Sequence, residues 1–187
     1  MEFKDIEDIE NIVKYAIEEL YKNDIFIIKN KEHEASITAR IAMYLRDKIE
    51  ASNESKNGEN KVYDKSNDNK KIVVDCEYNR HLTGQKFVNG EDGKKMRPDI
   101  IIHTRGCDDN NILFCEAKKG NLDSDDYKKL NSATKEPYEY KYALGIYNIK
   151  PDKITLKWYI KSESQNPIIC KYDVKDNKLV SPQIDGE

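Results

Sequence analysis

Charged side chains stand at the ends of two apolar runs in the middle of the chain. The first run, IIIH, follows Asp99, while the second, NILFCEA, contains Glu116 and is followed by Lys118. A plain core strand avoids such residues, because an unpaired buried charge is costly. Two carboxylates held close together repel each other, and a bound cation relieves that repulsion. The residue types therefore suit a hard divalent ion such as Mg²⁺ or Mn²⁺, which takes carboxylate oxygens and keeps waters for a substrate.

The turn between the two runs predicts how these side chains meet. Segment 106–111 is rich in turn-forming residues, so the runs are expected to form an antiparallel hairpin. A turn centred on that segment would place Asp99 opposite Lys118. The same register would place Ile101 opposite Glu116. Cross-strand neighbours are about 5 Å apart and residues two apart share a face, so the three charged groups should converge at one end of the sheet.

A third acidic residue, Glu34, belongs to a predicted helix. Apolar residues at helical spacing predict this helix from about Glu32 to Glu50, with a stripe of Ile37, Ile41, Leu45 and Ile49. Glu34 lies one turn before that stripe and could reach the end of the sheet. The alternative is a local role, because a negative charge in the first turn favours the helix dipole by about 0.3–1 kcal/mol.

Three further charged residues are candidates for binding. Glu77 lies on the polar face of a strand expected at 71–80 and could be an additional metal ligand. Arg80 could contact a phosphate, and Lys119 could contact a nucleic-acid backbone. For Arg80 and Lys119 the alternative is a surface position that contacts only water.

Other polar and aromatic residues are expected to be structural. His103 shares the face of Asp99 but lies four residues away, roughly 13 Å at strand rise. Lys128 and Lys129 are expected to be solvated helix residues. Trp158 and most of the tyrosines are expected to pack in the core, although some tyrosines could stack on bases.

The remaining patterns predict an α/β protein with a mixed central sheet flanked by helices. Besides the helix at 32–50, the chain should form helices at 5–21 and 122–136, a short apolar segment at 25–30, and strands at 71–80, 100–103, 111–117, 142–149, 155–160 and 166–172. Residues 51–70 are polar and predict a mobile loop. We expect one domain over 1–187, with its core at about 32–160.

Composition restricts the class of protein. The net charge of −3 gives no global basic field, so contact with nucleic acid would need a local patch. The four cysteines have neither the paired spacing of zinc sites nor a small disulfide-rich context. The acidic N-terminal segment lacks the pattern of a signal peptide, and no apolar run reaches the roughly 18 residues of a membrane span. A cytoplasmic protein is expected.

Five segments of the chain together resemble a known superfamily. They are HEASITARIAMYL, VDCEYNRH, RPDIIIHTRG, NILFCEAKKG and DYKKLNSAT, between about Glu32 and Ile149. With Pro98-Asp99 followed by Glu116-Ala117-Lys118, the chain resembles the PD-(D/E)XK, or restriction-endonuclease-like, nuclease superfamily, and more closely a group of uncharacterised bacterial proteins within it. The short motif is weak alone, whereas the five segments in order are fairly specific. The polar insert at 51–70 departs from the pattern without touching the motif.

The resemblance implies a fold, an activity and a site. The fold would be a restriction-endonuclease-like αβββαβ core, and the activity Mg²⁺- or Mn²⁺-dependent hydrolysis of phosphodiesters in nucleic acid, with DNA favoured over RNA. Asp99 and Glu116 would be metal ligands together with the Ala117 carbonyl, Lys118 would activate water, and Glu34 would reach the metal directly or through a water. Metal offsets negative charge in such a reaction, and a neighbouring lysine opposes the charge that develops.

A rival prediction is a catalytically inactive module on the same fold that binds nucleic acid or a protein partner. The intact set of Asp99, Glu116 and Lys118 favours the enzyme, because a retired site tends to lose one of its members. DNA or RNA specificity, endo- or exonuclease action, and monomer or homodimer all stay open at this point.

Overall fold

The computed structural model describes residues 5–30, 33–54, 71–81, 84–88, 95–108, 110–161 and 166–181. It shows an α/β protein. The elements found there are α1 Ile6–Lys29, α2 Glu34–Glu54, β1 Ile72–Cys76, β2 Arg80–His81, β3 Gly84–Gln85, β4 Ile100–Thr104, β5 Leu113–Ala117, α3 Ser124–Ala133, β6 Tyr142–Lys150, β7 Lys153–Ile160, β8 Ile168–Lys175 and β9 Lys178–Val180.

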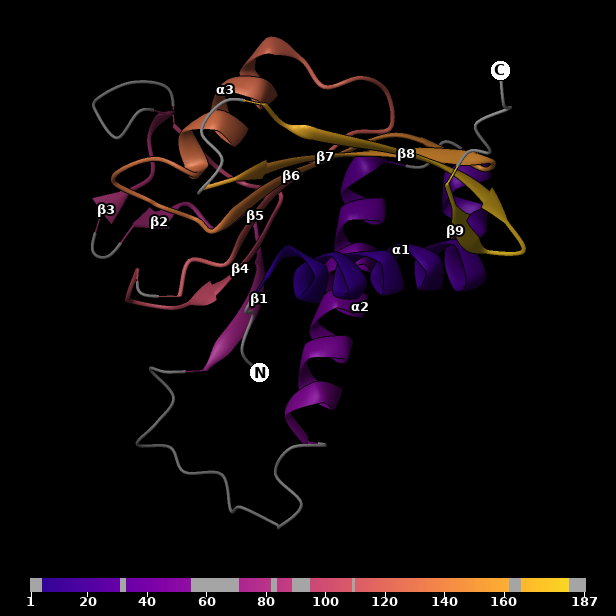
Figure 1. Cartoon of the computed structure of the whole chain (residues 1–187), viewed down its shortest axis with the longest axis horizontal. Coiled ribbons are helices and arrows are strands. Elements are labelled where there is room, and N and C mark those ends of the chain that lie inside the picture. Colours follow the sequence, from indigo (N-terminus) through magenta and orange to yellow (C-terminus); the bar gives the residue numbers. More distant parts are fainter. Residues whose placement is uncertain are drawn as a thin grey trace.

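A mixed seven-stranded sheet organises the molecule, in the order β1-β4-β5-β6-β7-β8-β9. Neighbouring strands are antiparallel except for β5 and β6, which are parallel and joined through α3. Helices α1 and α2 cross on one side of the sheet, while α3 lies on the other (Figure 1). Strands β2 and β3 form a separate small ribbon. None of the described helices carries an apolar stretch that could span a bilayer.

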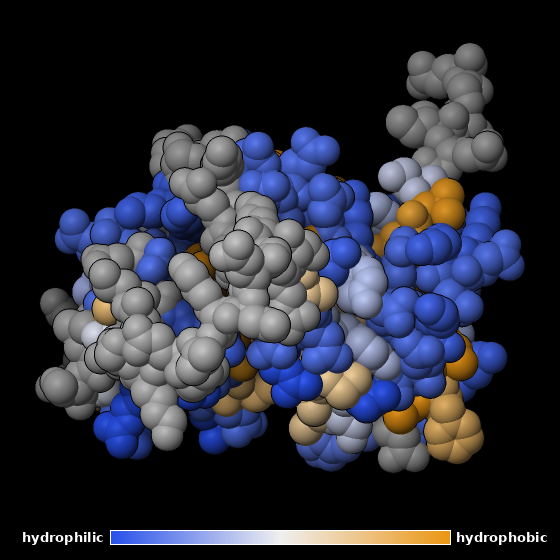
Figure 2. All heavy atoms as spheres, turned by 90° about the horizontal axis from the view of Figure 1, so that it is seen from below, coloured by the Kyte–Doolittle hydropathy of each residue, from blue (hydrophilic) through white to orange (hydrophobic). Residues whose placement is uncertain are grey.

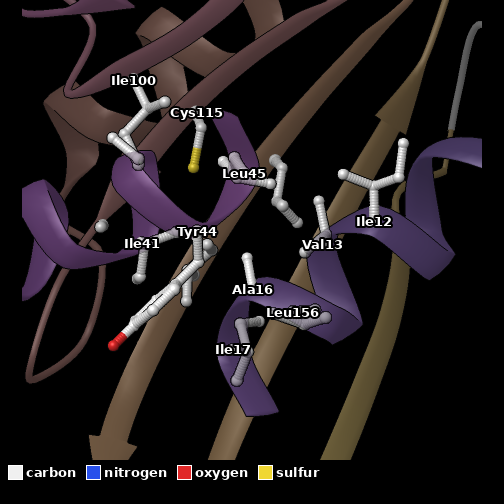
Figure 3. Packing of buried hydrophobic residues seen from close by; sticks show 14 of the residues in the cluster. Ile12, Val13, Ala16, Ile17, Ile41, Tyr44, Leu45, Ile100, Cys115 and Leu156 are labelled. Atoms are coloured by element: carbon white, nitrogen blue, oxygen red, sulfur yellow. The ribbon is translucent and has the colours of Figure 1, made fainter. Parts of the chain in front are cut away.

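The larger hydrophobic core lies between the sheet and the first two helices. Figure 3 shows Ala16 and Ile17 of α1, Ile41 and Leu45 of α2, and Leu156 of β7 facing one another across this layer. Burying side chains of this size is worth about 1.5–3 kcal/mol each, so the apolar stripes of the helices hold them on the sheet. On the side drawn in Figure 2, the described residues in view are mostly hydrophilic, and the hydrophobic ones form small separate patches.

Helix α1 is longer than predicted. It continues past Tyr21 to Lys29, so the apolar segment 25–30 belongs mostly to the helix and is not a separate element. The helix is kinked at Asp24, whose φ of −127° and ψ of 19° are not helical. The Asp24 carboxylate accepts hydrogen bonds from Arg40 Nε at 2.7 Å and from Tyr44 Oη at 2.5 Å, both on α2. These contacts hold the two helices together at the kink.

Helix α2 confirms the predicted stripe, since Ile37, Ile41, Leu45 and Ile49 are all buried. The helix begins at Glu34 and extends to Glu54, into the segment expected to be a loop. Residues 55–70, the rest of that predicted loop, lie outside the described residues, as does Glu32.

Strand β1 is shorter than the predicted strand at 71–80. It ends at Cys76, and Glu77 has a φ of 51°, in the left-handed region that an L-residue seldom adopts. This turn sends Tyr78 to the opposite side from the one that alternation predicts. Its ring lies 4.7 Å from the ring of His103, centre to centre, beside a second hydrophobic cluster on the α3 side of the sheet, which includes Ile101, Phe114, Leu130 and Tyr140.

The hairpin of β4 and β5 is antiparallel as predicted, but its register differs by two residues. Ile100 pairs with Cys115 and Ile101 with Phe114, so this register, continued by one residue, brings Asp99 level with Glu116 and not with Lys118. A shift of two residues leaves every side chain on its expected face, because alternation has a period of two.

The unit β5-α3-β6 places a helix directly over the end of β5. The helix is capped at its start: Asp123 is the N-cap, and Asp126 completes a capping box with it. Gly145 of β6 lies beside Glu116 in the parallel register. A Cβ at Gly145 would lie only 2.6 Å from Leu122 Cδ1, so the missing side chain allows the segment leading into α3 to pack closely here.

Candidate active site

Two carboxylates lie side by side at the end of the β4–β5 hairpin. Asp99 immediately precedes β4, its backbone N–H donates a hydrogen bond to the Cys115 carbonyl at 3.1 Å, and Glu116 is the next residue of β5. The Asp99 carboxylate accepts a hydrogen bond from the Ala117 backbone N–H at 2.7 Å. Burial raises the pKa of Asp99, and this hydrogen bond opposes the rise. The first two residues of the predicted site are therefore brought together as neighbours.

Glu116 is the most deeply buried acid of the site, with only 1% of the residue exposed. Its Oε2 accepts a hydrogen bond from Lys129 Nζ at 2.8 Å, whereas its Oε1 is buried without a hydrogen-bond partner. Burial, and then the charge of Asp99, raise the pKa of Glu116 to about 8, although Lys129 acts in the opposite direction. A buried oxygen without a partner is uncommon, so this atom is the clearest sign that the site can accept a further group.

Lys118 lies between two acidic residues at the edge of this pair. Its Nζ is 3.5 Å from Glu34 Oε1 and 3.9 Å from Asp126 Oδ2. Burial would lower the pKa of Lys118, but the negative charges of Asp126 and Glu34 outweigh that effect and raise it. The lysine is therefore held as an ammonium group beside the carboxylates.

Glu34 joins the helix layer to this end of the sheet. Its Oε2 accepts a hydrogen bond from the Lys119 backbone N–H at 3.0 Å, while its Oε1 faces Lys118. Its charge also raises the pKa of Asp99. The start of α2 therefore lies at the predicted end of the sheet, and Glu34 does more than complement the dipole of its own helix.

A cleft of about 420 Å³ opens between α2 and the ends of β1 and β4. Its lining includes Glu34, Thr38, Cys76, Glu77 and Asp99. Glu77 is exposed and its carboxylate lies 3.5 Å from Arg97 Nη1. Arg80 on β2 is exposed, and its backbone carbonyl accepts a hydrogen bond from the Lys86 amine. Within the described part of the chain, the residues that line the cleft include Glu77 but neither Arg80 nor Lys119.

No family model, curated protein or solved structure matches this chain. The function of the site must therefore be inferred from its own geometry and chemistry.

Two residues of α3 belong to the site although the sequence did not indicate them. Lys129 was expected to be solvated, which is wrong: its side chain is 18% exposed and binds Glu116. Lys128, by contrast, is 67% exposed, as predicted. Asp126 is buried and lies near both Lys118 and Lys129. A usable signal was present, because Asp126 and Lys129 are three residues apart and share a helix face with the buried Leu130.

The donor atoms fit a divalent cation that keeps part of its water shell. Among the described residues, no group of three or more His, Cys, Asp and Glu side chains is arranged to hold a metal. Asp99 and Glu116 could instead supply two carboxylates, and the Ala117 carbonyl lies between Glu116 and Lys118 in the chain. Mg²⁺ is commonly held by one or two carboxylates and several waters, so a pair of acids suffices. Direct ligation by Glu34 stays a prediction, since both of its oxygens have other contacts here.

Proposed function

We propose that this protein is a Mg²⁺- or Mn²⁺-dependent nuclease that hydrolyses phosphodiesters, with DNA as the preferred substrate. The observation that carries the proposal is the proximity of Asp99 to Glu116, whose Oε1 is buried and unsatisfied, two residues before Lys118. Such a pair costs the protein stability unless another group compensates for it.

Each side chain has a distinct role in the proposed reaction. Asp99 and Glu116 hold the cation, and the cation, when bound, supplies positive charge that offsets the phosphate and activates water. Lys118 orients the attacking water and opposes the negative charge that develops on it. Glu34 positions Lys118 and the backbone at Lys119 through its two contacts.

The order of elements supports the same proposal. The succession α2, β1, β4, β5, α3 and β6 follows the αβββαβ order that the resemblance implies, with Asp99 just before the second of these strands and Glu116 near the end of the third. The ribbon β2–β3 is an addition between the first and second of these strands.

One contact favours the non-catalytic alternative. The ammonium group of Lys129 already compensates Glu116, at 2.8 Å. A protein that no longer used metal could offset the negative charge of Glu116 with Lys129. It would then bind nucleic acid or a partner without cleaving it.

The decisive test combines cleavage with metal binding in purified protein. Single- and double-stranded DNA and RNA are incubated with Mg²⁺, Mn²⁺ or EDTA. We expect cleavage with either metal and none in EDTA. Lys118→Ala should reduce cleavage by about 100-fold or more, the scale of one positioned acid–base group. Lys128→Ala is the matched control, because Lys128 is exposed on α3 and should leave cleavage unchanged.

Thermal unfolding gives a readout that does not depend on cleavage. Mg²⁺ should raise the melting temperature of the wild type, since a ligand that binds only the folded state stabilises it. Asp99→Asn should remove that rise. A full rise in the variant would exclude Asp99 as a ligand, and binding of DNA without cleavage under any metal condition would favour the non-catalytic module.

A further inference from the structure

Three tyrosines and a lysine, all partly exposed, lie together on α3 and on the neighbouring strands β6 and β7. Lys157 Nζ lies over the ring of Tyr127 at 4.4 Å from its centre and near the ring of Tyr159 at 5.7 Å. Tyr147 joins them, and all three tyrosines pack partly buried against the second hydrophobic cluster. Burial raises the pKa of Tyr159 to about 12, and the nearby Tyr127 and Tyr147 hydroxyls add to the rise. We call Tyr127, Tyr147, Lys157 and Tyr159 the tyrosine–lysine surface.

This surface is aligned with the candidate active site across the sheet. Glu116 pairs with Gly145, Gly145 with Lys157, and Lys157 with Ile169. Residues paired in this way share one face of a sheet. With strands about 4.8 Å apart, the backbone of Lys157 lies roughly 10 Å from that of Glu116 in this row of paired residues. Between them, Leu122 and Leu130 cover Gly145, so the surface lies beside the site without an open path along the sheet.

On β7 and β8, the same face of the sheet carries mostly basic charged residues, and part of it is exposed. Ile169, at the end of the row, is 51% exposed, although it is a large apolar side chain. Alternation places Lys153 and Lys157 of β7 on this face, with Lys171 of β8 beside them. Asp173 of β8 shares it as the acidic member of the same two strands. In a chain of net charge −3, this is a local excess of positive charge.

We propose that the tyrosine–lysine surface binds a single-stranded segment of nucleic acid close to the Asp99–Glu116 site. The inference depends on the proposed nuclease function for its substrate class. Partly exposed tyrosines offer ring surfaces to unpaired bases, and lysines among them offer charge to the phosphates. A duplex keeps its bases stacked inside, so it would meet the lysines without using the rings. An acidic peptide would likewise use the lysines and not the rings.

The test measures binding in EDTA, so that cleavage plays no part. The probe is a fluorescein-labelled oligothymidylate of about 12 nucleotides, a length within single-strand site sizes, and binding is followed by fluorescence anisotropy. We expect Tyr127→Ala and Tyr159→Ala each to weaken binding roughly 5- to 100-fold, the scale of one lost base stack. Tyr127→Phe should bind like the wild type, because the ring is kept.

Tyr15→Ala is the matched control on the other side of the sheet. Lys48 Nζ lies over the Tyr15 ring at 4.6 Å, so the same kind of pair is removed far from the row. Unchanged binding in both alanine variants of the surface, or equal losses in Tyr15→Ala, would overturn the proposal. So would losses that are as large for a duplex or for polyglutamate as for the oligothymidylate. Binding that follows these expectations in a protein without cleavage activity would refute the nuclease proposal and leave the surface standing.

Discussion

The buried carboxyl of Glu116 should make the stability of the metal-free protein depend on pH. The pKa of Glu116 rises from 4.5 to about 8 in the folded state because of burial and the charge of Asp99. Between these two values the unfolded chain binds fewer protons at this position than the folded protein. The contribution of Glu116 to the free energy of unfolding is therefore fully present below pH 4.5 and is lost as the pH rises through 8.

The magnitude follows from the width of that window. Each pH unit within it costs about 1.4 kcal/mol, so raising the pH from 5 to 8 should remove about 4 kcal/mol of unfolding free energy. This is a large share of the roughly 5–15 kcal/mol that holds a typical domain. The residue is 1% exposed, so screening by water reduces the effect little.

The measurement is chemical unfolding in EDTA at several pH values, for the wild type and for Glu116→Gln. The variant cannot ionise here, so its stability relative to the wild type should increase with pH by the amount above. Glu50→Gln, at an exposed glutamate, is the control and should show no such trend. A difference between Glu116→Gln and the wild type that does not change from pH 5 to 8 would refute the reasoning, because Lys129 would then keep Glu116 ionised throughout.

Three other substitutions test features around the site. Gly145→Ala should cost about 1–3 kcal/mol in chemical unfolding, since its Cβ would meet Leu122 at 2.6 Å, and an unchanged value would mean that Leu122 turns away freely. Asp123→Ala should cost about 0.5–2 kcal/mol through the lost helix cap, measured by thermal unfolding, and no loss would show that the cap contributes nothing. Hydrogen bonds from Arg105 and His103 outweigh burial and hold the pKa of Asp75 below its usual range, so Arg105→Ala should destabilise the protein at pH 7. That loss should fade as acid protonates Asp75, and a loss that is equal at pH 7 and in acid would contradict the assignment.

The sequence predicted the acidic pair better than it predicted the register that forms it. Alternation fixes which face Asp99 and Glu116 share, and a slip of two residues does not alter that face. The hairpin turn determines the register, and its composition indicated a turn without fixing where each strand begins. The pairing of Asp99 with Glu116 therefore had to come from the structure.

The role of Lys129 could not be predicted for a different reason. Its contact with Glu116 depends on how closely α3 approaches β5 and β6, and that distance depends on the missing side chain of Gly145. Lys129 and Gly145 are 16 positions apart in the chain and are linked only through packing. Local sequence patterns cannot predict such a link. The kink at Asp24 is similar, because its partners Arg40 and Tyr44 belong to another helix.

The anchoring of α1 has a consequence for synthesis on the ribosome. The helix is made before the sheet, yet several of its polar contacts are with β8 and β9: Glu10 accepts a hydrogen bond from Tyr172, and Glu18 contacts Lys178 and the Leu179 backbone. Sequence separations of about 160 residues imply slow, late closure. Until β8 and β9 emerge, the apolar stripe of α1 lacks part of its docking site. A nascent chain stalled before residue 168 should therefore expose that stripe to chaperones, and truncation of the last two strands should impair folding far more than their small share of the core suggests.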